Sequence, residues 1–273
     1  FFKKNMMKFK NDVAIFLAAR SGSKRLPNKH FYKLSQNNMA IDMCINRIKK
    51  SKTVKKIFLC TTKKREDHKF KDISKKHNIE LFQGSENNVL KRFIDCGVKF
   101  SIKNIVRITA DCPFVDPKII DKCVKIHLKK NVDYTSNTLK LTYPDGLDVE
   151  VIKLESLIKS YSINKKDLYN QEHVTSFIRT SKLFKKYNIE SLINYSDRRW
   201  TLDNKKDLVF LKKAANFFHP NINFSWKKLI LAEKKFDYLF NHKSRINIKS
   251  NFKKKIIIGS ANFTQTYGLK NKK

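Results

Sequence analysis

Glycine, proline and cysteine are all scarce in this sequence of 273 residues, which contains six, five and five of them. So little glycine and proline excludes a collagen-like or low-complexity chain. The cysteines are odd in number and form no Cys-x-x-Cys pair, which argues against a disulfide framework or a zinc site. We expect them to be small buried side chains in a cytoplasmic protein. The longest apolar run, Val13–Ala19, is far too short to span a membrane, so no membrane insertion is expected.

Acidic residues are also few, because 24 Asp and Glu stand against 60 Lys and Arg, giving a net charge of +36. A surplus of this size usually indicates nucleic acid or an anionic surface as the partner. Here, however, fifty of the basic residues are Lys and only ten are Arg. Proteins that bind phosphates or bases tend to use Arg forks as well as Lys. We therefore interpret most of the charge as a solvated surface set by composition, and we do not expect nucleic acid as the partner.

Short apolar runs alternate with amphipathic stretches along the first half of the chain. Strands are predicted at Val13–Ala19, Lys56–Thr61, Glu80–Phe82 and Asn104–Thr109, and helices at Met39–Lys50, Glu66–His77 and Asn87–Phe100. This alternation implies βαβ units, hence an α/β fold with a mostly parallel sheet and helices on both faces. The loops that follow the strands then meet at one edge of the sheet, where ligands bind in such folds.

The second half of the chain has a mixed pattern. We expect a helix from about Asp116–Pro117, strands at Asp133–Tyr134, Asp148–Ile152 and Arg198–Leu202, and helices at Leu154–Tyr161, Asp167–Thr180, Lys205–Phe217 and 225–242. Asp111 and Asp203 each follow a predicted strand, where an Asp is usually a helix cap. Asp148 and Glu150 lie two residues apart in a predicted strand and would face the same side.

The most informative segment directly follows the first predicted strand, at residues 18–29. A strand that leads into a turn of small residues offers backbone N–H groups to an anion. Arg20, Lys24, Arg25 and Lys29 add positive charge that suits a polyphosphate. The spacings of a Walker loop and of a Gly-x-Gly-x-x-Gly fingerprint are both absent. By its charge alone, the segment could equally be a basic surface loop.

The order of residues in this loop resembles the Ala-Arg-x-x-Ser-x-Arg-Leu-Pro-x-Lys pattern of the sugar cytidylyltransferases, which include the CMP-sialic acid and CMP-3-deoxyoctulosonate synthetases. Further stretches match in the same order at residues 83–92, 107–113, 143–151, 172–175 and 200–208. The spore-coat polysaccharide branch is the most similar. The resemblance implies the Rossmann-like, three-layer nucleotide-diphospho-sugar transferase fold over residues 12–250, after an N-terminal extension at 1–11.

The resemblance also implies an activity and its residues. The expected reaction transfers CMP from CTP to a sugar, preferably a sugar acid, and releases pyrophosphate for surface polysaccharide synthesis. The implied cofactor is Mg²⁺, with Asp111 and Asp203 as ligands, and the implied catalytic residues are Arg20, Lys29 and Asp111. The nucleotide would contact Ala18, Ala19, Arg20, Ser23, Arg25, Lys29, Gly84 and Ser85, and the acceptor would contact Asp148, Glu150, Glu172 and His173.

Two departures from the family pattern leave the substrates open. Asn170 and Gln171 stand where relatives commonly carry Asp-Arg, and the loss of that Arg removes a partner for an anionic acceptor. Asn87, Asn88 and Lys91 replace acidic residues of the base-side loop, so selectivity for cytosine is less secure. The alternatives are a transferase for another nucleotide, a glycosyltransferase on the same scaffold, or an inactive, basic nucleic-acid-binding protein. Because the synthetases that it resembles commonly dimerise, a homodimer is a further expectation.

The C-terminal tail, residues 251–273, carries a second and shorter resemblance. Residues 255–269 are similar to the opening strand and turn of the aldo/keto reductases. A barrel of that kind needs about 250 residues, so no reductase domain or NADPH site is expected in this chain. The tail is either the beginning of a truncated fusion or a Lys-rich end whose similarity is due to chance.

Overall fold

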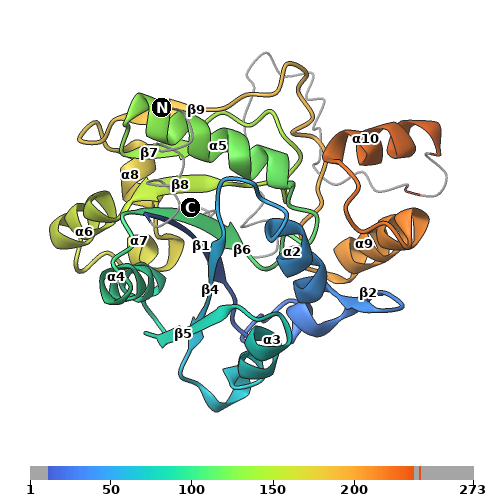
Figure 1. Cartoon of the computed structure of the whole chain (residues 1–273), viewed down its shortest axis with the longest axis horizontal. Coiled ribbons are helices and arrows are strands. Elements are labelled where there is room, and N and C mark those ends of the chain that lie inside the picture. Colours follow the sequence, from blue (N-terminus) through green and yellow to red (C-terminus); the bar gives the residue numbers. More distant parts are fainter. Residues whose placement is uncertain (1–11, 237–239, 241–273) are drawn as a thin grey trace, which may run out of the picture.

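A single central sheet organises residues 12–236 and Phe240, which are the residues that the computed structural model describes (Figure 1). Its seven strands are β1 (Val13–Ala18), β4 (Lys56–Thr62), β5 (Glu80–Gly84), β6 (Asn104–Thr109), β7 (Tyr134–Ser136), β8 (Glu150–Lys153) and β9 (Lys186–Asn188). Their order is β5-β4-β1-β6-β8-β7-β9, and only β8 runs against its neighbours. The expected mostly parallel sheet is confirmed. The extension at 1–11 and the tail at 251–273 lie outside the described residues.

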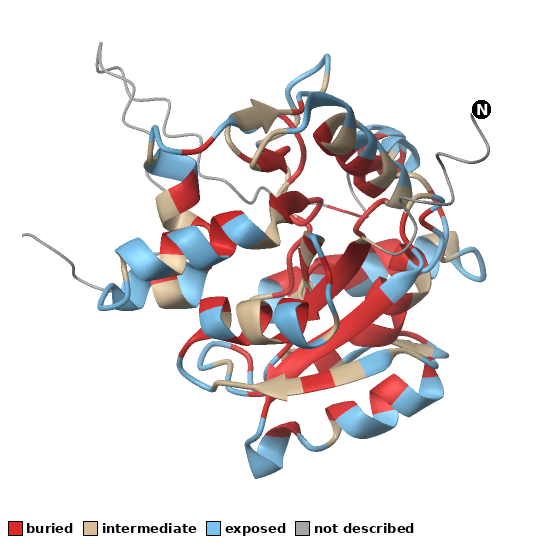
Figure 2. Ribbon diagram, turned by 60° about the vertical axis from the view of Figure 1, so that its left-hand side comes forward, coloured by how far each residue is buried: buried red, intermediate tan, exposed pale blue. Residues whose placement is uncertain are grey.

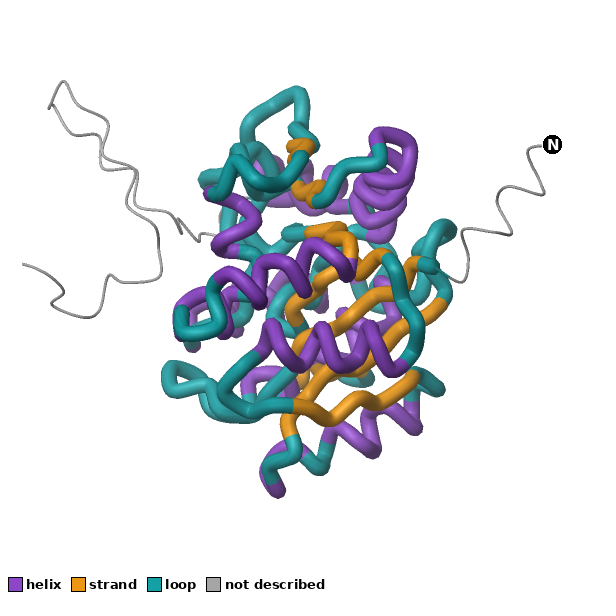
Figure 3. The backbone as a smooth tube through the Cα atoms, turned by 90° about the vertical axis from the view of Figure 1, so that its left-hand side faces the viewer, coloured by secondary structure: helices purple, strands orange, loops and turns teal. Residues whose placement is uncertain are grey.

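Helices cover both faces of this sheet (Figures 1 and 3). They are α2 (Ala40–Ile48), α3 (Phe70–Lys76), α4 (Val89–Lys99), α5 (Pro117–Lys130), α6 (Leu154–Ile163), α7 (Leu168–His173), α8 (Ser176–Thr180), α9 (Lys205–Phe218) and α10 (Trp226–Lys235). Alternate residues of β1 point to opposite faces of the sheet and pack against the two helical layers. Ile15 and Leu17 join a core with α2, α3, α5, α9 and α10, whereas Ala14 and Phe16 join a core with α4, α6 and α8. The buried strands between the two layers are evident in Figure 2.

The strand order changes direction beside β1. From β1 the chain moves to β4 and β5 on one side, and then crosses back to β6 on the other side. In an open α/β sheet, ligands bind at such a switch point, outside the carboxyl ends of the strands. The loops that follow β1 and β6 meet here, where the Ala110 N–H donates to the Ala18 carbonyl at 3.0 Å. The fold therefore brings the loop at 18–29 next to Asp111.

Three short elements were not predicted from the sequence. The strands β2 (Lys33–Ser35) and β3 (Asn38–Met39) form a hairpin that packs on α9 (Figure 1). The edge strand β9 has only three residues, and its burial is intermediate throughout. Segments this short have no apolar period that could be recognised, because their pairing is decided by residues far away in the chain.

The predicted strand at Arg198–Leu202 is wrong, because this segment joins no sheet. Its backbone instead forms an isolated bridge to Asp145, with Trp200 N–H donating to the Asp145 carbonyl at 2.6 Å and Asp145 N–H donating to the Arg198 carbonyl at 2.9 Å. The Trp200 indole N–H donates to Glu233 at 2.7 Å, which fixes the segment against α10. Trp200, Thr201 and Leu202 are all buried, so the apolar residues here belong to a buried extended loop.

The predicted helix at Asp167–Thr180 is interrupted, and it forms the two helices α7 and α8. Val174 has a positive φ of 62°, which no helix can accommodate. The strand predicted at Asp148–Ile152 begins two residues later, at Glu150, so Asp148 lies in the preceding loop. The expectation that Asp148 and Glu150 share one face of a strand is therefore wrong.

The five cysteines, Cys44, Cys60, Cys96, Cys112 and Cys123, are all buried and unpaired, as expected of small apolar side chains. Burial raises the pKa of the Cys44 and Cys123 thiols to about 12, so both stay protonated. Within the described residues, none of the helices combines the length and the apolar character that crossing a bilayer requires.

Replacement of Gly146 tests the backbone bridge between the loop at Asp145 and the segment at Arg198–Leu202. Gly146 has φ +99°, and an added Cβ would lie 2.6 Å from the carbonyl carbon of Trp200. We expect Gly146→Ala to lower the free energy of unfolding by about 2–3 kcal/mol, measured by urea denaturation. In the control Gly22→Ala, the new Cβ meets only Glu66 Oε1 at 3.8 Å, so the change should stay within about 0.5 kcal/mol. Equal losses in the two variants would contradict this account.

Candidate active site

The loop after β1 is fixed at its base and open at its tip. Asp67 is buried, and it accepts hydrogen bonds from the Ser21 N–H at 2.7 Å and the Thr62 hydroxyl at 2.5 Å. Burial alone would raise the pKa of Asp67, but these hydrogen bonds hold it below its usual value. The Ser23 hydroxyl accepts from the Leu26 N–H at 3.3 Å, which closes the turn. The sequence analysis did not identify Asp67 as the residue that anchors this loop.

Lys29 lies at the centre of the site. Its Nζ donates to Asp111 Oδ2 at 2.6 Å and to Asp203 Oδ1 at 2.8 Å, and its side chain is 12% exposed. Arg25 approaches the other Asp203 oxygen at 3.4 Å. The structure thus brings together four residues from three separate segments that the sequence predicted for phosphate and metal binding. They are Arg25, Lys29, Asp111 and Asp203.

The charges in this cluster support each other. Burial would lower the pKa of Lys29, but the two carboxylates raise it above its usual value. Burial would likewise raise the pKa of Asp111, but the Lys29 ammonium holds it well below its usual range. Both groups are therefore ionised at neutral pH. The neighbouring His30 is buried, which lowers its pKa to about 4 and keeps its ring neutral.

Arg199 is a second cation in this cluster, and the sequence analysis missed it. Its guanidinium donates to Asp145 at 2.8 Å, to Asp203 at 2.7 Å and to Asp207 at 3.1 Å. These carboxylates raise the pKa of Arg199 against the effect of burial. Asp203 is further placed by the backbone, since the Leu202 N–H donates to the Asp111 carbonyl at 2.8 Å. The only signal in the sequence was the Arg four residues before Asp203.

On the other side of the loop, Arg20 contacts α7. Its guanidinium lies 2.5 Å from the carboxylate of Glu172, and both side chains are about half exposed, at 47% and 51%. The His173 ring packs against Tyr169, with centroids 4.2 Å apart. Burial lowers the pKa of His173; the Glu172 charge opposes this effect, and the charges of Arg107 and Arg20 reinforce it. Arg20 of the loop after β1 therefore shares one surface with Glu172 and His173 of α7.

Glu150 lies below this surface rather than on it. Its side chain is buried, with one oxygen accepting from Tyr134 at 2.5 Å and Thr175 at 2.7 Å, and with Arg107 bound to the other oxygen. Asp148 is half-buried in the loop before β8. The pKa of Cys112 is raised by burial, and also by the charges of Asp111 and Asp148.

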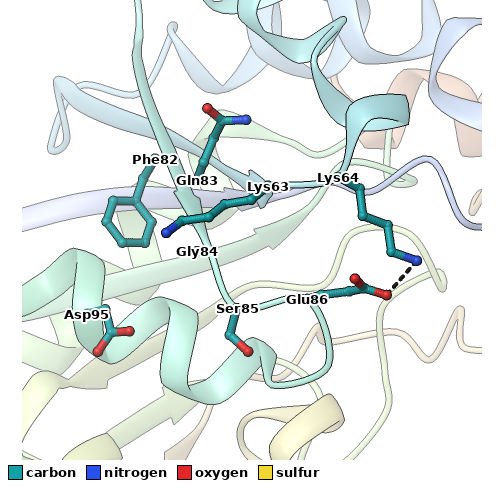
Figure 4. A pocket seen from close by; sticks show the side chains of 8 residues that line it. All are labelled: Lys63, Lys64, Phe82, Gln83, Gly84, Ser85, Glu86 and Asp95. Carbon is teal, nitrogen blue, oxygen red and sulfur yellow. Dashed lines mark ion pairs between the residues drawn. The ribbon is translucent and has the colours of Figure 1, made fainter.

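Gly84 and Ser85 lie at the end of β5, beside the buried Arg92. The Arg92 guanidinium donates to the Ser85 carbonyl at 2.7 and 2.9 Å, and a Cβ on Gly84 would lie 2.7 Å from Arg92 Cγ. A hollow of ≈ 580 Å³ opens alongside (Figure 4). It is lined by Lys63, Lys64, Phe82, Gln83, Gly84, Ser85, Glu86 and Asp95, and Lys64 pairs with Glu86 across it at 2.5 Å.

Asp111 and Asp203 are the residues best placed to hold a metal ion. Within residues 12–236 and Phe240, no three His, Cys, Asp or Glu side chains form a ready metal cluster. Mg²⁺ does not require one, since it commonly binds one or two carboxylates together with substrate phosphates and water. Two carboxylates that share one ammonium, at the mouth of a basic loop, are a donor set of this kind.

Two known proteins are similar to this chain over most of its length. The spore coat polysaccharide biosynthesis protein SpsF of Bacillus subtilis is 32% identical over 213 residues, which cover 74% of this chain and 85% of SpsF. An uncharacterized protein of Methanocaldococcus jannaschii is 34% identical over 242 residues, covering 88% of this chain and 95% of that protein.

The solved structure of a cytidylyltransferase from Leptospira borgpetersenii superposes with a TM-score of 0.81 at 29% identity. This match covers 86% of the present chain and 98% of that structure. The family model of the cytidylyltransferases itself matches residues 14–240. Because this match covers most of the chain, this protein belongs to the cytidylyltransferase family, as its sequence predicted.

Proposed function

We propose that the protein transfers CMP from CTP to a sugar acid and releases pyrophosphate, in a Mg²⁺-dependent reaction that serves surface polysaccharide synthesis. The observation that carries this proposal is the contact of the Lys29 ammonium with both Asp111 and Asp203, beside the loop after β1. Membership of the cytidylyltransferase family supports the nucleotide, and the similarity to SpsF supports the pathway class.

The chemistry needs positioning and charge neutralisation. An acceptor hydroxyl attacks the α-phosphorus, a new P–O bond forms, and the bond to the pyrophosphate oxygen breaks. Negative charge grows on the phosphate oxygens, where Arg20, Arg25 and Lys29 would bind the triphosphate. Mg²⁺, when held by Asp111 and Asp203, supplies Lewis-acid neutralisation of the same oxygens.

The acceptor would bind against Glu172 and His173. The lowered pKa of His173 keeps its ring neutral at pH 7, so a ring nitrogen can accept a hydrogen bond from the attacking hydroxyl. The charges of Arg20 and Arg107 both act on His173. Arg107 is bound to the buried Glu150, so Arg20 would provide the electrostatic preference for an acidic sugar. Gln171 cannot supply that charge, because its amide is neutral and donates to the Lys165 carbonyl at 2.6 Å.

The base would be recognised at Gly84 and Ser85. Asn88, which replaces an acidic residue of the family pattern, has its own function here. Its side chain accepts from the Lys91 N–H at 2.7 Å and caps α4. Because Asn caps a helix as well as Asp does, this replacement preserves the base-side turn.

The direct test incubates the protein with CTP, Mg²⁺ and a panel of 3-deoxy sugar acids and measures the pyrophosphate released. We expect release that needs both the sugar and the nucleotide, with CTP preferred over ATP, GTP and UTP by at least about tenfold in kcat/KM. If no pair of substrates releases pyrophosphate, in protein shown to be folded by circular dichroism, the proposed function is refuted.

Replacement of Asp111 tests the proposed metal ligand. Asp111→Asn removes one of the two carboxylates, so we expect kcat to fall by about 10²–10³-fold. The control is Asp12→Asn, at the amino end of β1 on the opposite edge of the sheet, where the side chain pairs with Lys103 at 3.3 Å. It should retain wild-type activity. Full activity of Asp111→Asn would remove Asp111 from the proposed metal site.

Replacement of Lys29 separates phosphate binding from metal binding. Lys29→Met removes the ammonium that lies between Asp111 and Asp203, and only Asp203 keeps cationic neighbours, Arg25 and Arg199. Mg²⁺ alone should therefore raise the Tm of the variant more than that of the wild type. The same change should lower kcat/KM for CTP by about 10–100-fold, because the charged hydrogen bonds to phosphate are lost. Lys33→Met, at an exposed position of β2, is the matched control. An equal Mg²⁺ response in all three proteins would argue against a cation site here.

A further inference from the structure

A strained turn separates α7 from α8. Val174 has φ 62° and ψ −53°, and the Thr175 N–H donates to the His173 carbonyl at 2.6 Å. A hydrogen bond that closes over three residues around such a conformation is a γ-turn of the rare, strained type. A positive φ is a genuine outlier for a β-branched residue, and helices that end in this region usually have Gly or Asn there. The surrounding structure must therefore hold the turn in place.

The strongest support for the turn comes from the sheet. The Thr175 hydroxyl donates to Glu150 Oε1 at 2.7 Å, and Tyr134 on β7 donates to the same oxygen at 2.5 Å. Arg107 on β6 binds the second carboxylate oxygen. Glu150 is 2% exposed, so three neighbours satisfy a charge that would be very unfavourable alone. The Glu150 carboxylate is thus held rigidly by the sheet, and its hydrogen bond with Thr175 fixes the turn to the sheet.

Asn170 and Val174 fix the other side of the turn. Asn170 Oδ1 accepts from the Ser176 hydroxyl at 2.9 Å and from the Phe177 N–H at 3.2 Å, and its Nδ2 donates to Ser160 at 3.3 Å. The Val174 side chain is fully buried in the core that includes α4, α6 and α8. Rotation of Val174 to a relaxed conformation would withdraw this side chain from the core, so packing and hydrogen bonds both oppose it.

The turn also decides which side chains face solvent. Val174 and Thr175 are buried, whereas the two preceding residues, Glu172 and His173, are exposed. Glu172 then meets Arg20 of the phosphate loop at 2.5 Å. A continuous helix from α7 into α8 would change the direction of these side chains. The reversal at Val174 therefore places the proposed acceptor residues opposite the proposed phosphate residues.

We propose that Glu150 is a positioning residue, which acts through Thr175 to hold the strained turn that presents Glu172 and His173 to the acceptor. This replaces the expectation that Glu150 touches the sugar. The effect on acceptor binding rests on the proposed function, whereas the link from Glu150 to the turn is a property of the fold. The two are tested separately.

The test uses Thr175→Val, which removes the hydroxyl and retains the shape of the side chain. Thr180→Val is the matched control, because its hydroxyl bonds only to carbonyls of its own helix, at 3.1 and 3.4 Å. Amide hydrogen exchange at residues 172–175 should become at least about tenfold faster in Thr175→Val and stay unchanged in the control. With the most active sugar acid of the panel, KM for the acceptor should rise about tenfold while KM for CTP changes less than about twofold.

Thr175→Ser retains a hydroxyl, so it should restore both the wild-type exchange rate at residues 172–175 and the wild-type KM for the acceptor. If Thr175→Val fails to fold, Tyr134→Phe removes another bond to the same carboxylate oxygen and should accelerate the same amides. Wild-type exchange in a folded Thr175→Val protein would overturn the inference, and so would equal rises in the two KM values. If the wild type transfers CMP to no sugar acid, the proposed function fails, and the exchange measurement alone still decides whether Glu150 holds the turn.

Discussion

The attraction between two cations and a group of aspartates holds the centre of this molecule together. Asp111, Asp145 and Asp203 come from three different loops, and carboxylates this close in a partly buried site would repel one another strongly. Lys29 and Arg199 make their assembly favourable, because each bonds to Asp203 and to one of the other two. Since Lys29 belongs to the loop after β1, the same contacts join this loop to the carboxylates. The proposed binding of phosphate and the proposed binding of a metal ion would therefore be coupled by geometry.

The large positive net charge of the chain does not leave the basic residues of the proposed site without acidic partners. The basic residues that matter for the proposed reaction already have acidic partners, with Arg20 on Glu172 and Lys29 on Asp111. A nucleoside triphosphate would compete with these carboxylates for the cations. Arg20 is half exposed and can exchange partners readily, because an exposed ion pair contributes little. Lys29 is nearly buried, so a bound metal ion would be the more effective replacement for its charge on the carboxylates.

Sequence reasoning was most successful where the information is local. The long strands and the helices follow the period of their apolar residues, so β6 and most helices were predicted within a few residues. It failed where distant residues decide the structure. The segment at Arg198–Leu202 alternates like a strand, but it pairs with Asp145 instead of a sheet. Arg199 and Asp67 were missed for the same reason, since neither lies in a motif whose function is evident until its partners are seen.

Asn170 shows what a structure adds to a departure from a family pattern. From the change of Asp-Arg to Asn170-Gln171 we interpreted the loss of the Arg as the loss of an anion partner, and the sequence assigned no role to Asn170. Asn170 is fully buried and uses both ends of its amide, accepting from Ser176 and Phe177 and donating to Ser160. An Asp at this position could accept but could not donate, whereas the Asn amide does both. Only the change at Gln171 bears on the acceptor, and it leaves Arg20 and Arg107 as the cations whose charges reach His173. Recognition of an acidic sugar would then depend on Arg20 leaving Glu172, because Arg107 is bound to the buried Glu150.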